Sequence, residues 1–415
     1  ERAGPLPSAN PAARSAEGRP VNASPPSSAA PAAARPLRVL HFVSGGFSGA
    51  TQVAIDLCGE QPGQQTMLVL RRRASVDPAP RVRELRERGL LVEVVPRWSH
   101  TVTIWALARI CRDWQPDVLV AHGFSEHLWG RYAGLRAGVP RLIQVEHNTR
   151  ENYGFWRLRQ SLRLAKRTER IIAVSQAVRD ALVRLGHPAE RCTVVVNGIE
   201  LGRWTQGRPW DEREDAIVMP ARFAAQKDHF TLIRATALLA AQGLRPVVYL
   251  AGEGKSSWRA RAERLARELG VQEQVRFLGH VSDMPELLGR VKLCVLSTHY
   301  EGLGLGLIEG MVSGCCGIGS DVEGVQEVLT HGETGFLVPH EDAQGLAQTL
   351  ARCLQDSAGT ARVAAAGQLH ARAAFDRRRM RRQYLELFSH PPTEKVGTNP
   401  PARPDPQAHS SAAFG

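Results

Sequence analysis

Short apolar runs alternate with longer amphipathic segments along most of this chain. Each run is too short for a typical helix and is bounded by polar or glycine residues, a pattern typical of strands buried on both faces of a sheet. In the first half, strands are expected at 38–43, 66–70, 91–95, 117–121, 141–146, 170–174 and 193–196. Helices are expected between them at 51–57, 80–88, 102–113, 126–136 and 176–185. This alternation predicts an α/β fold built on a doubly wound parallel sheet.

The same alternation begins again after residues 203–214. That stretch is polar and contains Gly207 and Pro209, so we interpret it as a linker between two domains, at 37–205 and 206–375. In the second domain, strands are expected at 216–219, 247–251, 274–278, 291–296 and 335–338. Helices are expected at 229–241, 258–269, 343–355 and 358–374, with short ones near 305 and 321 and a basic closing helix at 376–388.

The two ends of the chain differ in composition from the rest. Residues 1–36 are mostly Ala, Pro and Ser, and residues 391–415 are rich in Pro. Such segments bury too little apolar surface to fold, so we expect both to be disordered.

Size and cysteine usage narrow the class of protein. A chain of 415 residues is long enough for two domains with full cores. Its seven cysteines are scattered, with no CxxC pair and no spacing typical of zinc ligands. We therefore expect reduced core thiols, a cytoplasmic location and no metal site. No apolar run reaches the roughly 18 residues that a membrane-spanning helix needs.

The net charge of +12 is concentrated in the first domain. Residues 37–205 contain 25 Lys and Arg against 15 Asp and Glu, whereas residues 206–390 contain 22 of each kind. A basic first domain favours an anionic partner, either a membrane surface or an acceptor molecule. No nucleic-acid recognition motif accompanies the charge, and few aromatic residues are interleaved with it, so nucleic acid is not an expected partner.

Residues 153–170 combine apolar and basic side chains in a way that leaves two interpretations open. The apolar set is Phe155, Trp156, Leu158, Leu162 and Leu164, and Arg and Lys separate its members. A helix here either packs its apolar side on the core or lies on an anionic membrane surface.

The stretch 291–310 carries the strongest chemical signal. A strand is followed by a polar turn, by glycines at alternate positions 302, 304 and 306, and by a helix that starts near Leu305. Glycines let a ligand approach the backbone closely, and the N–H groups and dipole of a helix start favour an anion. Glu301 and Glu309 flank this loop and would repel a phosphate, so we expect them to hold hydroxyl groups on either side of it. A nucleotide sugar has this layout, whereas the spacing fails the dinucleotide fingerprint and no nicotinamide cofactor is expected.

Other candidate residues follow predicted strands, where parallel sheets bind their ligands. Gly45 and Gly46 come after the first strand and before a helix, which suits a loop that closes on phosphate or sugar. His122 directly follows the strand 117–121. Arg222 and Lys227 lie between the strand 216–219 and the helix 229–241, where two cations can neutralise a diphosphate.

In this order, the motifs resemble those of the family-4 retaining glycosyltransferases, which have the GT-B fold. The resemblance covers roughly residues 37–389. It rests on Gly45-Gly46, His122, Arg222 with Lys227, Gly279, and Glu301 with Glu309 in the segment EGLGLGLIEG. It implies two Rossmann-like domains that face each other across a cleft, the first for the acceptor and the second for a nucleotide sugar. It also implies that the helix at 376–390 returns to the first domain.

The resemblance further implies a role for each residue. Arg222 and Lys227 would hold the diphosphate, Glu301 the donor sugar and Glu309 the ribose. The backbone of Gly304 and Leu305 would contact the sugar and phosphate of the donor, and the backbone of His280 and Val281 would lie beside its base. His122 would lie near the donor sugar.

These inferences together predict a retaining, metal-independent glycosyltransferase. It would move a hexosyl or other sugar from a UDP- or GDP-sugar to a glycan or lipid-linked acceptor in lipopolysaccharide, capsule or exopolysaccharide biosynthesis. It would use no cofactor and be cytoplasmic, peripheral on the inner membrane face. The alternative is a nucleotide-sugar epimerase, or another non-transferase nucleotide-sugar enzyme, on the same fold. An epimerase needs acid/base residues beyond His122, and the sequence identifies none.

Overall fold

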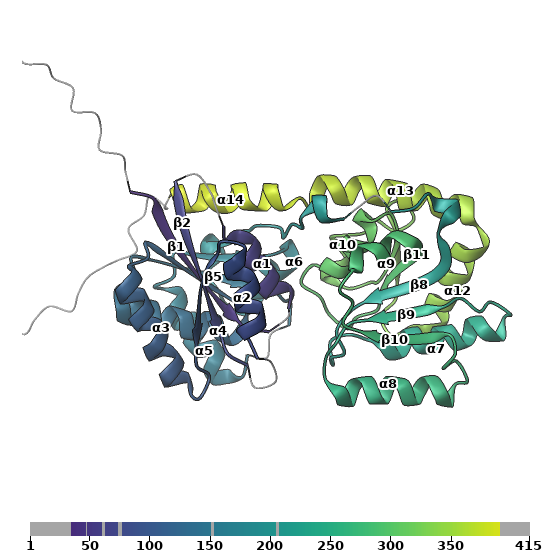
Figure 1. The fold of residues 1–415 in the computed structure, drawn as a ribbon, viewed down its shortest axis with the longest axis horizontal. Coiled ribbons are helices and arrows are strands. Elements are labelled where there is room, and N and C mark those ends of the chain that lie inside the picture. The colour runs from purple at the N-terminus through teal and green to yellow at the C-terminus, as the bar shows by residue number, and fades with distance from the viewer. Residues whose placement is uncertain are drawn as a thin grey trace, which may run out of the picture. The chain divides into compact units, whose positions relative to one another are not determined.

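Parallel strands of the first sheet run in the order β3-β2-β1-β4-β5-β6-β7 (Figure 1). The computed structural model describes residues 35–46, 48–59, 63–73, 77–150, 153–204 and 207–390, so nearly all of the segments expected to be disordered lie outside the described residues. The strands of this sheet are β1 (Leu37–Ser44), β2 (Gln64–Arg71), β3 (Leu91–Val95), β4 (Val118–His122), β5 (Arg141–Glu146), β6 (Arg170–Ala173) and β7 (Cys192–Val194).

The second sheet has the order β10-β9-β8-β11-β12-β13, and its strand pairs are also parallel. Its strands are β8 (Glu214–Pro220), β9 (Val248–Ala251), β10 (Val275–Gly279), β11 (Val291–Leu296), β12 (Cys316–Ser320) and β13 (Phe336–Val338). The two strand orders confirm the predicted doubly wound α/β class. In each sheet the winding reverses between two adjacent strands, β1 and β4 in the first and β8 and β11 in the second.

Helices connect the strands of both sheets. In the first half they are α1 (Gly49–Leu57), α2 (Ala79–Glu87), α3 (His100–Trp114), α4 (Phe124–Ala137), α5 (Phe155–Ala165) and α6 (Gln176–Arg184). In the second they are α7 (His229–Ala241), α8 (Ser256–Glu268), α9 (Met284–Arg290), α10 (Leu305–Val312), α11 (Glu323–Gln326), α12 (Ala343–Gln355), α13 (Ser357–Ala374) and α14 (Arg377–Ser389). Short 3-10 helices lie at Ala189–Arg191, Leu201–Arg203 and Trp210–Glu212.

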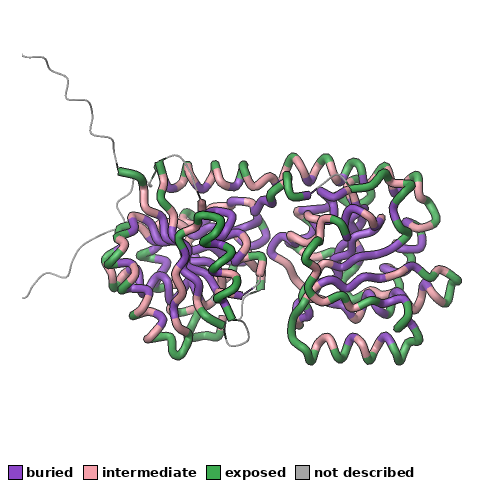
Figure 2. The backbone as a smooth tube through the Cα atoms, viewed as in Figure 1, coloured by how far each residue is buried: buried purple, intermediate pink, exposed green. Residues whose placement is uncertain are grey.

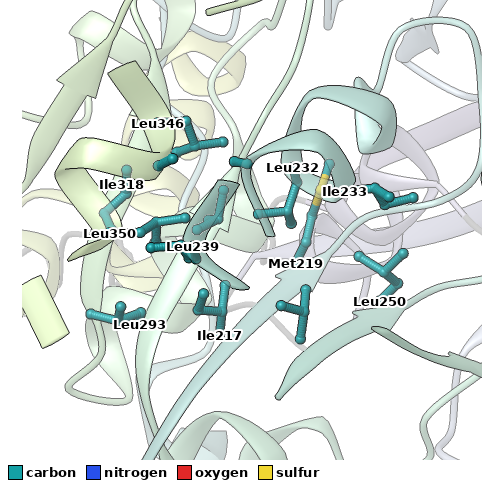
Figure 3. Packing of buried hydrophobic residues seen from close by; sticks show 14 of the residues in the cluster. Ile217, Met219, Leu232, Ile233, Leu239, Leu250, Leu293, Ile318, Leu346 and Leu350 are labelled. Carbon is teal, nitrogen blue, oxygen red and sulfur yellow. The ribbon is translucent and has the colours of Figure 1, made fainter. Parts of the chain in front are cut away.

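The central strands of each sheet are buried on both faces (Figure 2). Successive residues of β8 alternate between two cores, because Ile217 and Met219 face α7, α8 and α12 while Ala216 and Val218 face α9, α10 and α13. Figure 3 shows the first of these cores, in which Leu232 and Leu350 contribute from α7 and α12. All seven cysteines are buried and free, as the sequence predicts.

Strand β12 was not predicted, because two of the five residues in its sequence CGIGS are glycine, which weakens the strand signal. A Cβ on Gly319 would meet Val325 Cγ1 at 2.5 Å, and one on Gly317 would meet Met311 Cγ at 3.1 Å. The glycines therefore allow the helices around β12 to pack closely on it, at the expense of strand propensity. The short helix α9 was missed as well.

Two structural features link the halves of the chain. Helix α14, which follows the second sheet in sequence, packs Met380, Tyr384 and Phe388 into a core of the first sheet. Glu327, at the end of α11, accepts hydrogen bonds from the backbone N–H groups of Gln176 (2.9 Å) and Ala177 (2.6 Å) at the start of α6. Within the described residues, no helix is both long and apolar enough to cross a bilayer.

Candidate functional site

The loops that follow β8 and β11 interlock at the carboxyl edge of the second sheet. Lys227 and Thr298 form an antiparallel bridge. The N–H of His299 donates to Gln226 O (2.9 Å), and the N–H of Asp228 donates to Ser297 O (3.0 Å). Because the winding reverses between these two strands, the helices that follow the loops, α7 and α10, lie on opposite faces of the sheet, and this edge is the position at which such sheets bind ligands.

Lys227 and Glu301 meet at this position. Lys227 Nζ forms an ion pair with Glu301 Oε2, and each side chain keeps 12% of its surface exposed. Gln226 Nε2 donates to Tyr300 O (2.9 Å) and to Asn148 Oδ1 (3.3 Å), and Thr149 Oγ1 donates to Glu301 O (3.1 Å). The backbone before Glu301 is therefore held from both sheets.

The three alternate glycines allow close backbone contacts. A Cβ on Gly302 would collide with the carbonyl oxygen of His147, and one on Gly306 would collide with that of Pro220 at the end of β8. Gly304 caps α10 with φ = 80°, a conformation that favours glycine. The start of α10, with its unsatisfied N–H groups, therefore lies beside the loop that carries Arg222 and Lys227.

Arg222 and Glu309 differ in their surroundings. Arg222 is exposed and forms no hydrogen bond or ion pair with the described residues. Glu309 is half-buried, and burial raises its pKa to about 7, with Arg203 lowering the pKa and Asp56 raising it. The loop after β8 thus carries a cation, Arg222, that is free to contact an anion. The neighbouring helix α10 carries a carboxyl group, that of Glu309, which titrates near neutrality.

Three histidine rings lie in a row in the first sheet. His122 ends β4 and is fully buried, with its Nε2 3.0 Å from His41 Nδ1 and its Nδ1 3.4 Å from His147 Nε2. Burial lowers the pKa of His41 to about 3 and that of His147 to about 3. Burial, together with the two neighbouring rings, lowers the pKa of His122 well below its usual range. All three rings are therefore neutral at pH 7.

The buried ring nitrogen of His41 that lacks a partner indicates which histidine of this row donates to which. His41 Nε2 is buried and has no partner among the described residues. An unfilled lone pair is a more common defect than a buried N–H without an acceptor, so we assign the His41 proton to Nδ1. His41 then donates to His122, and His122 donates to His147, the half-buried end of the row. Both ring nitrogens of His122 thus bond to other histidines. The approach of His122 to a donor sugar stays a prediction.

The other predicted residues occupy the carboxyl ends of further strands. Gly45 and Gly46 follow β1 and line a hollow of about 110 Å³ together with Ser48 and Thr51. A Cβ on Gly49, at the start of α1, would lie 3.2 Å from Leu305 Cδ1. Gly279 ends β10 with φ = 68°, His280 is exposed and Val281 is half-buried.

These contacts bring Lys227, Glu301 and the glycine loop together, whereas Arg222, Glu309 and residues 279–281 lie elsewhere along the same sheet edge. Gln226, Thr149 and His41 were not predicted from the sequence. Their side chains support others, and neither spacing nor composition marks such a role. His147 and Asn148 did carry one signal, because they follow a predicted strand.

Two doubly wound parallel sheets, with cations and carboxylates at the carboxyl edge of the second, are the architecture of the GT-B fold. Two family models match the chain in succession, Glycosyltransferase Family 4 over residues 47–203 and Glycosyl transferases group 1 over residues 203–370. The chain belongs to the group 1 glycosyltransferases, as its motifs predict.

One curated relative agrees with this assignment, and two solved structures share the fold. The lipopolysaccharide core biosynthesis glycosyltransferase LpsE of Rhizobium meliloti is 26% identical over 369 residues, which cover 86% of this chain and 100% of LpsE. The crystal structure of Anabaena Alr3699/HepE in complex with UDP-glucose superposes with a TM-score of 0.76 at 23% identity, covering 85% of this chain and 99% of HepE. The sucrose-phosphate synthase of Thermosynechococcus elongatus has a TM-score of 0.70 at 18% identity, covering 85% and 98%.

Proposed function

We propose that this glycosyltransferase transfers a sugar from a UDP- or GDP-sugar to a glycan or lipid-linked acceptor with retention and without a catalytic metal, in the assembly of a lipopolysaccharide, capsule or exopolysaccharide. The observation that carries the proposal is the pairing of Lys227 with Glu301 beside the glycine loop. A diphosphate and a sugar bound there would separate the pair, the lysine contacting phosphate and the carboxylate contacting hydroxyls.

The charge that develops on the leaving diphosphate explains how these residues would accelerate the reaction. As the glycosidic bond breaks, negative charge gathers on the leaving diphosphate and the sugar becomes oxocarbenium-like. Lys227, Arg222 and the start of α10 would stabilise that charge more in the transition state than in the bound donor, which is the requirement for acceleration. Cationic side chains would thereby replace a metal at the diphosphate.

Proton transfer would not require a protein base. We propose that the leaving phosphate takes the acceptor proton on the face that it leaves, which gives retention. The neutral row His41–His122–His147 supports this proposal, because rings whose pKa values lie far below 7 are poor general bases.

Names of similar proteins support the donor and the pathway. HepE was crystallised with UDP-glucose, and LpsE is described as a lipopolysaccharide core enzyme. We propose the same classes of donor and product for this chain, with the base beside His280 and Val281 and the ribose on Glu309.

Helix α5 supports a cytoplasmic enzyme that works on an anionic membrane surface. Ser161, Leu164 and Ala165 face the core, whereas Phe155 and Trp156 at its start are 70% and 72% exposed and are followed by Arg157 and Arg159. Exposed aromatic side chains beside arginines suit the headgroup region of such a membrane. A lipid-linked acceptor would be presented there.

The reaction is tested by incubating the full chain with UDP- and GDP-sugars and measuring nucleotide release and the shift in melting temperature. One donor should raise the melting temperature, and adding Mg²⁺ should leave the release rate unchanged. Donor conversion without any acceptor would instead indicate an epimerase. No response to any donor, with Glu301→Gln behaving as wild type, would remove the proposal.

Membrane contact is tested by sedimentation with vesicles of phosphatidylcholine alone or with added phosphatidylglycerol. Phe155→Ser/Trp156→Ser should bind the anionic vesicles more weakly than wild type. Leu369→Ser is the matched control, because Leu369 is 73% exposed on α13. Equal binding by all three proteins would exclude a role for the start of α5.

A further inference from the structure

Three side chains from two loops converge at the carboxyl edge of the second sheet. His299 lies two residues before Glu301, and His340 and Glu341 lie in the turn after β13. His299 Nδ1 lies 2.6 Å from His340 Nε2 and 3.3 Å from Glu341 Oε1, and His340 Nε2 lies 3.9 Å from the same oxygen. The sequence gives no hint of this cluster, because about 40 residues separate its two parts.

The three separations match the size of a metal ion. The circumradius of a triangle with these sides is about 2.0 Å, so one central point lies at that distance from both nitrogens and the oxygen. Zn²⁺ binds imidazole nitrogen at roughly 2.0–2.1 Å and carboxylate oxygen at roughly 2.0–2.2 Å. An ion at the central point would be at bonding distance from all three atoms but in one plane with them, so tetrahedral Zn²⁺ would require a small rotation of the two rings that widens the 2.6 Å separation of His299 Nδ1 and His340 Nε2.

We propose that His299 Nδ1, His340 Nε2 and Glu341 Oε1 bind a first-row divalent transition-metal ion, with Zn²⁺ as the reference. Two imidazoles and one carboxylate suit zinc and its neighbours, whereas Mg²⁺ and Ca²⁺ prefer oxygen ligands. The side chains are 28%, 37% and 62% exposed in that order, so the ion reaches them from solvent and water completes its coordination.

Local backbone geometry holds Glu341 against the histidines. Its φ of 62° lies in the left-handed region, which is uncommon for a residue other than glycine. The turn is closed by a hydrogen bond from Asp342 N–H to Pro339 O (3.2 Å), and Asp342 then caps α12 by accepting from Gly345 N–H (2.9 Å). An unfavourable conformation fixed from both sides is typical of a position with a function.

His299 is fixed from the opposite side, because its N–H donates to Gln226 O next to Lys227. A bound ion would therefore tie the turn after β13 to the loop that carries Glu301. This site is separate from the diphosphate position, where we expect no metal, and its occupancy does not depend on the proposed transfer reaction.

Isothermal titration of the full chain, without a histidine tag, tests the site. Zn²⁺ should bind at a ratio of one to one, and Mg²⁺ should not compete. His340→Ala and Glu341→Gln should each weaken Zn²⁺ binding by about tenfold or more. His390→Ala, which removes an exposed histidine at the end of α14, should bind as wild type.

Thermal unfolding shows whether a variant binds Zn²⁺ weakly only because it no longer folds. Without metal, Glu341→Gln should melt as wild type, because it keeps the size of the side chain. With Zn²⁺, the melting temperature of wild type should rise more than that of Glu341→Gln. Equal Zn²⁺ affinity in wild type, His340→Ala and Glu341→Gln would overturn the proposal, whatever the result with sugar donors.

Discussion

Lys227 and Glu301 form an ion pair that joins the loop after β8 to the loop after β11. Both side chains are nearly covered, so removing one leaves the other as an uncompensated charge. The pair also lies where the winding of the second sheet reverses, the position at which open α/β sheets bind their ligands. Its two members are therefore the first residues to change.

Lys227→Met should reduce kcat for sugar transfer by roughly 10²–10³, the usual cost of losing one group that stabilises transition-state charge. Nucleotide release under saturating donor measures the effect. Lys292→Met is the matched control, because Lys292 is 12% exposed and pairs with Asp215 at 2.7 Å but lies at the amino end of β11. A similar loss of rate in both variants would contradict a specific role for Lys227.

Glu309→Gln should stabilise the fold above neutral pH. Burial raises the Glu309 pKa from 4.5 to about 7, so between these values the folded state binds more protons than the unfolded state and stability falls as pH rises. Allowing for partial exposure, the variant should gain on the order of 2 kcal/mol at pH 8 relative to pH 5. Urea unfolding at the two pH values measures the gain, and Glu333→Gln, on an exposed residue, should show none.

Nucleotide binding should respond to Glu309 in the opposite direction. If the Glu309 carboxylate accepts hydrogen bonds from ribose hydroxyls, UDP affinity should increase as pH rises through about 7. Glu309→Gln should bind UDP more weakly and lose this pH dependence, although the protein itself is more stable. Calorimetric titrations at pH 6 and pH 8 separate the two effects, and an unchanged pH dependence in the variant would remove Glu309 from the ribose site.

His41→Leu should make the protein less sensitive to acid. The folded-state pKa of His41 is lowered from 6.5 to about 3, so stability falls as pH drops through this window. From pH 7 to pH 4.5, His41 should account for about 2–3 kcal/mol of the loss in unfolding free energy, which the variant would lack. Urea unfolding at both pH values measures it, and His390→Leu should retain the wild-type loss.

Glu327→Ala should destabilise the protein by about 1–2 kcal/mol, because its carboxylate accepts two N–H groups at the positive end of α6. Glu323→Ala is the control, since Glu323 contacts Arg184 of the same helix at 3.1 Å through a pair that is exposed on both sides. Pairs of that kind contribute little, so this variant should lose less than about 0.5 kcal/mol. Equal losses in chemical unfolding would contradict the capping role.

Most strands were predictable because fully buried strands in parallel sheets have uniform apolar sequences. The runs 91–95, 141–146 and 291–296 match β3, β5 and β11 at both ends. By contrast, β12 depends on the helices packed against it, and its glycines conceal it. The local hydrophobic pattern of a sequence indicates which residues are buried, but it does not indicate the size of the side chains that pack against them.

Some residues of the candidate site were likewise predictable from the sequence, and others were not. Lys227, Glu301 and the alternate glycines have fixed spacing after recognisable strands, so the sequence identifies them. The row from His41 to His147 depends on the alignment of β1, β4 and β5, which brings together residues about 80 and 25 positions apart. Hydrophobic periodicity does not specify such a register, and His41 looks like an ordinary member of its strand.

The placement of α14 has a consequence for biosynthesis. Val39 and Val120 share a core with Met380, Tyr384 and Phe388, so the last described helix covers strands that are translated long before it. While the intervening residues leave the ribosome, this core lacks the three side chains of α14, although α1 and α6 can already pack on it. The nascent chain must therefore keep the uncovered part of this core away from other chains until α14 is made, and folding of the first sheet ends with the arrival of that helix.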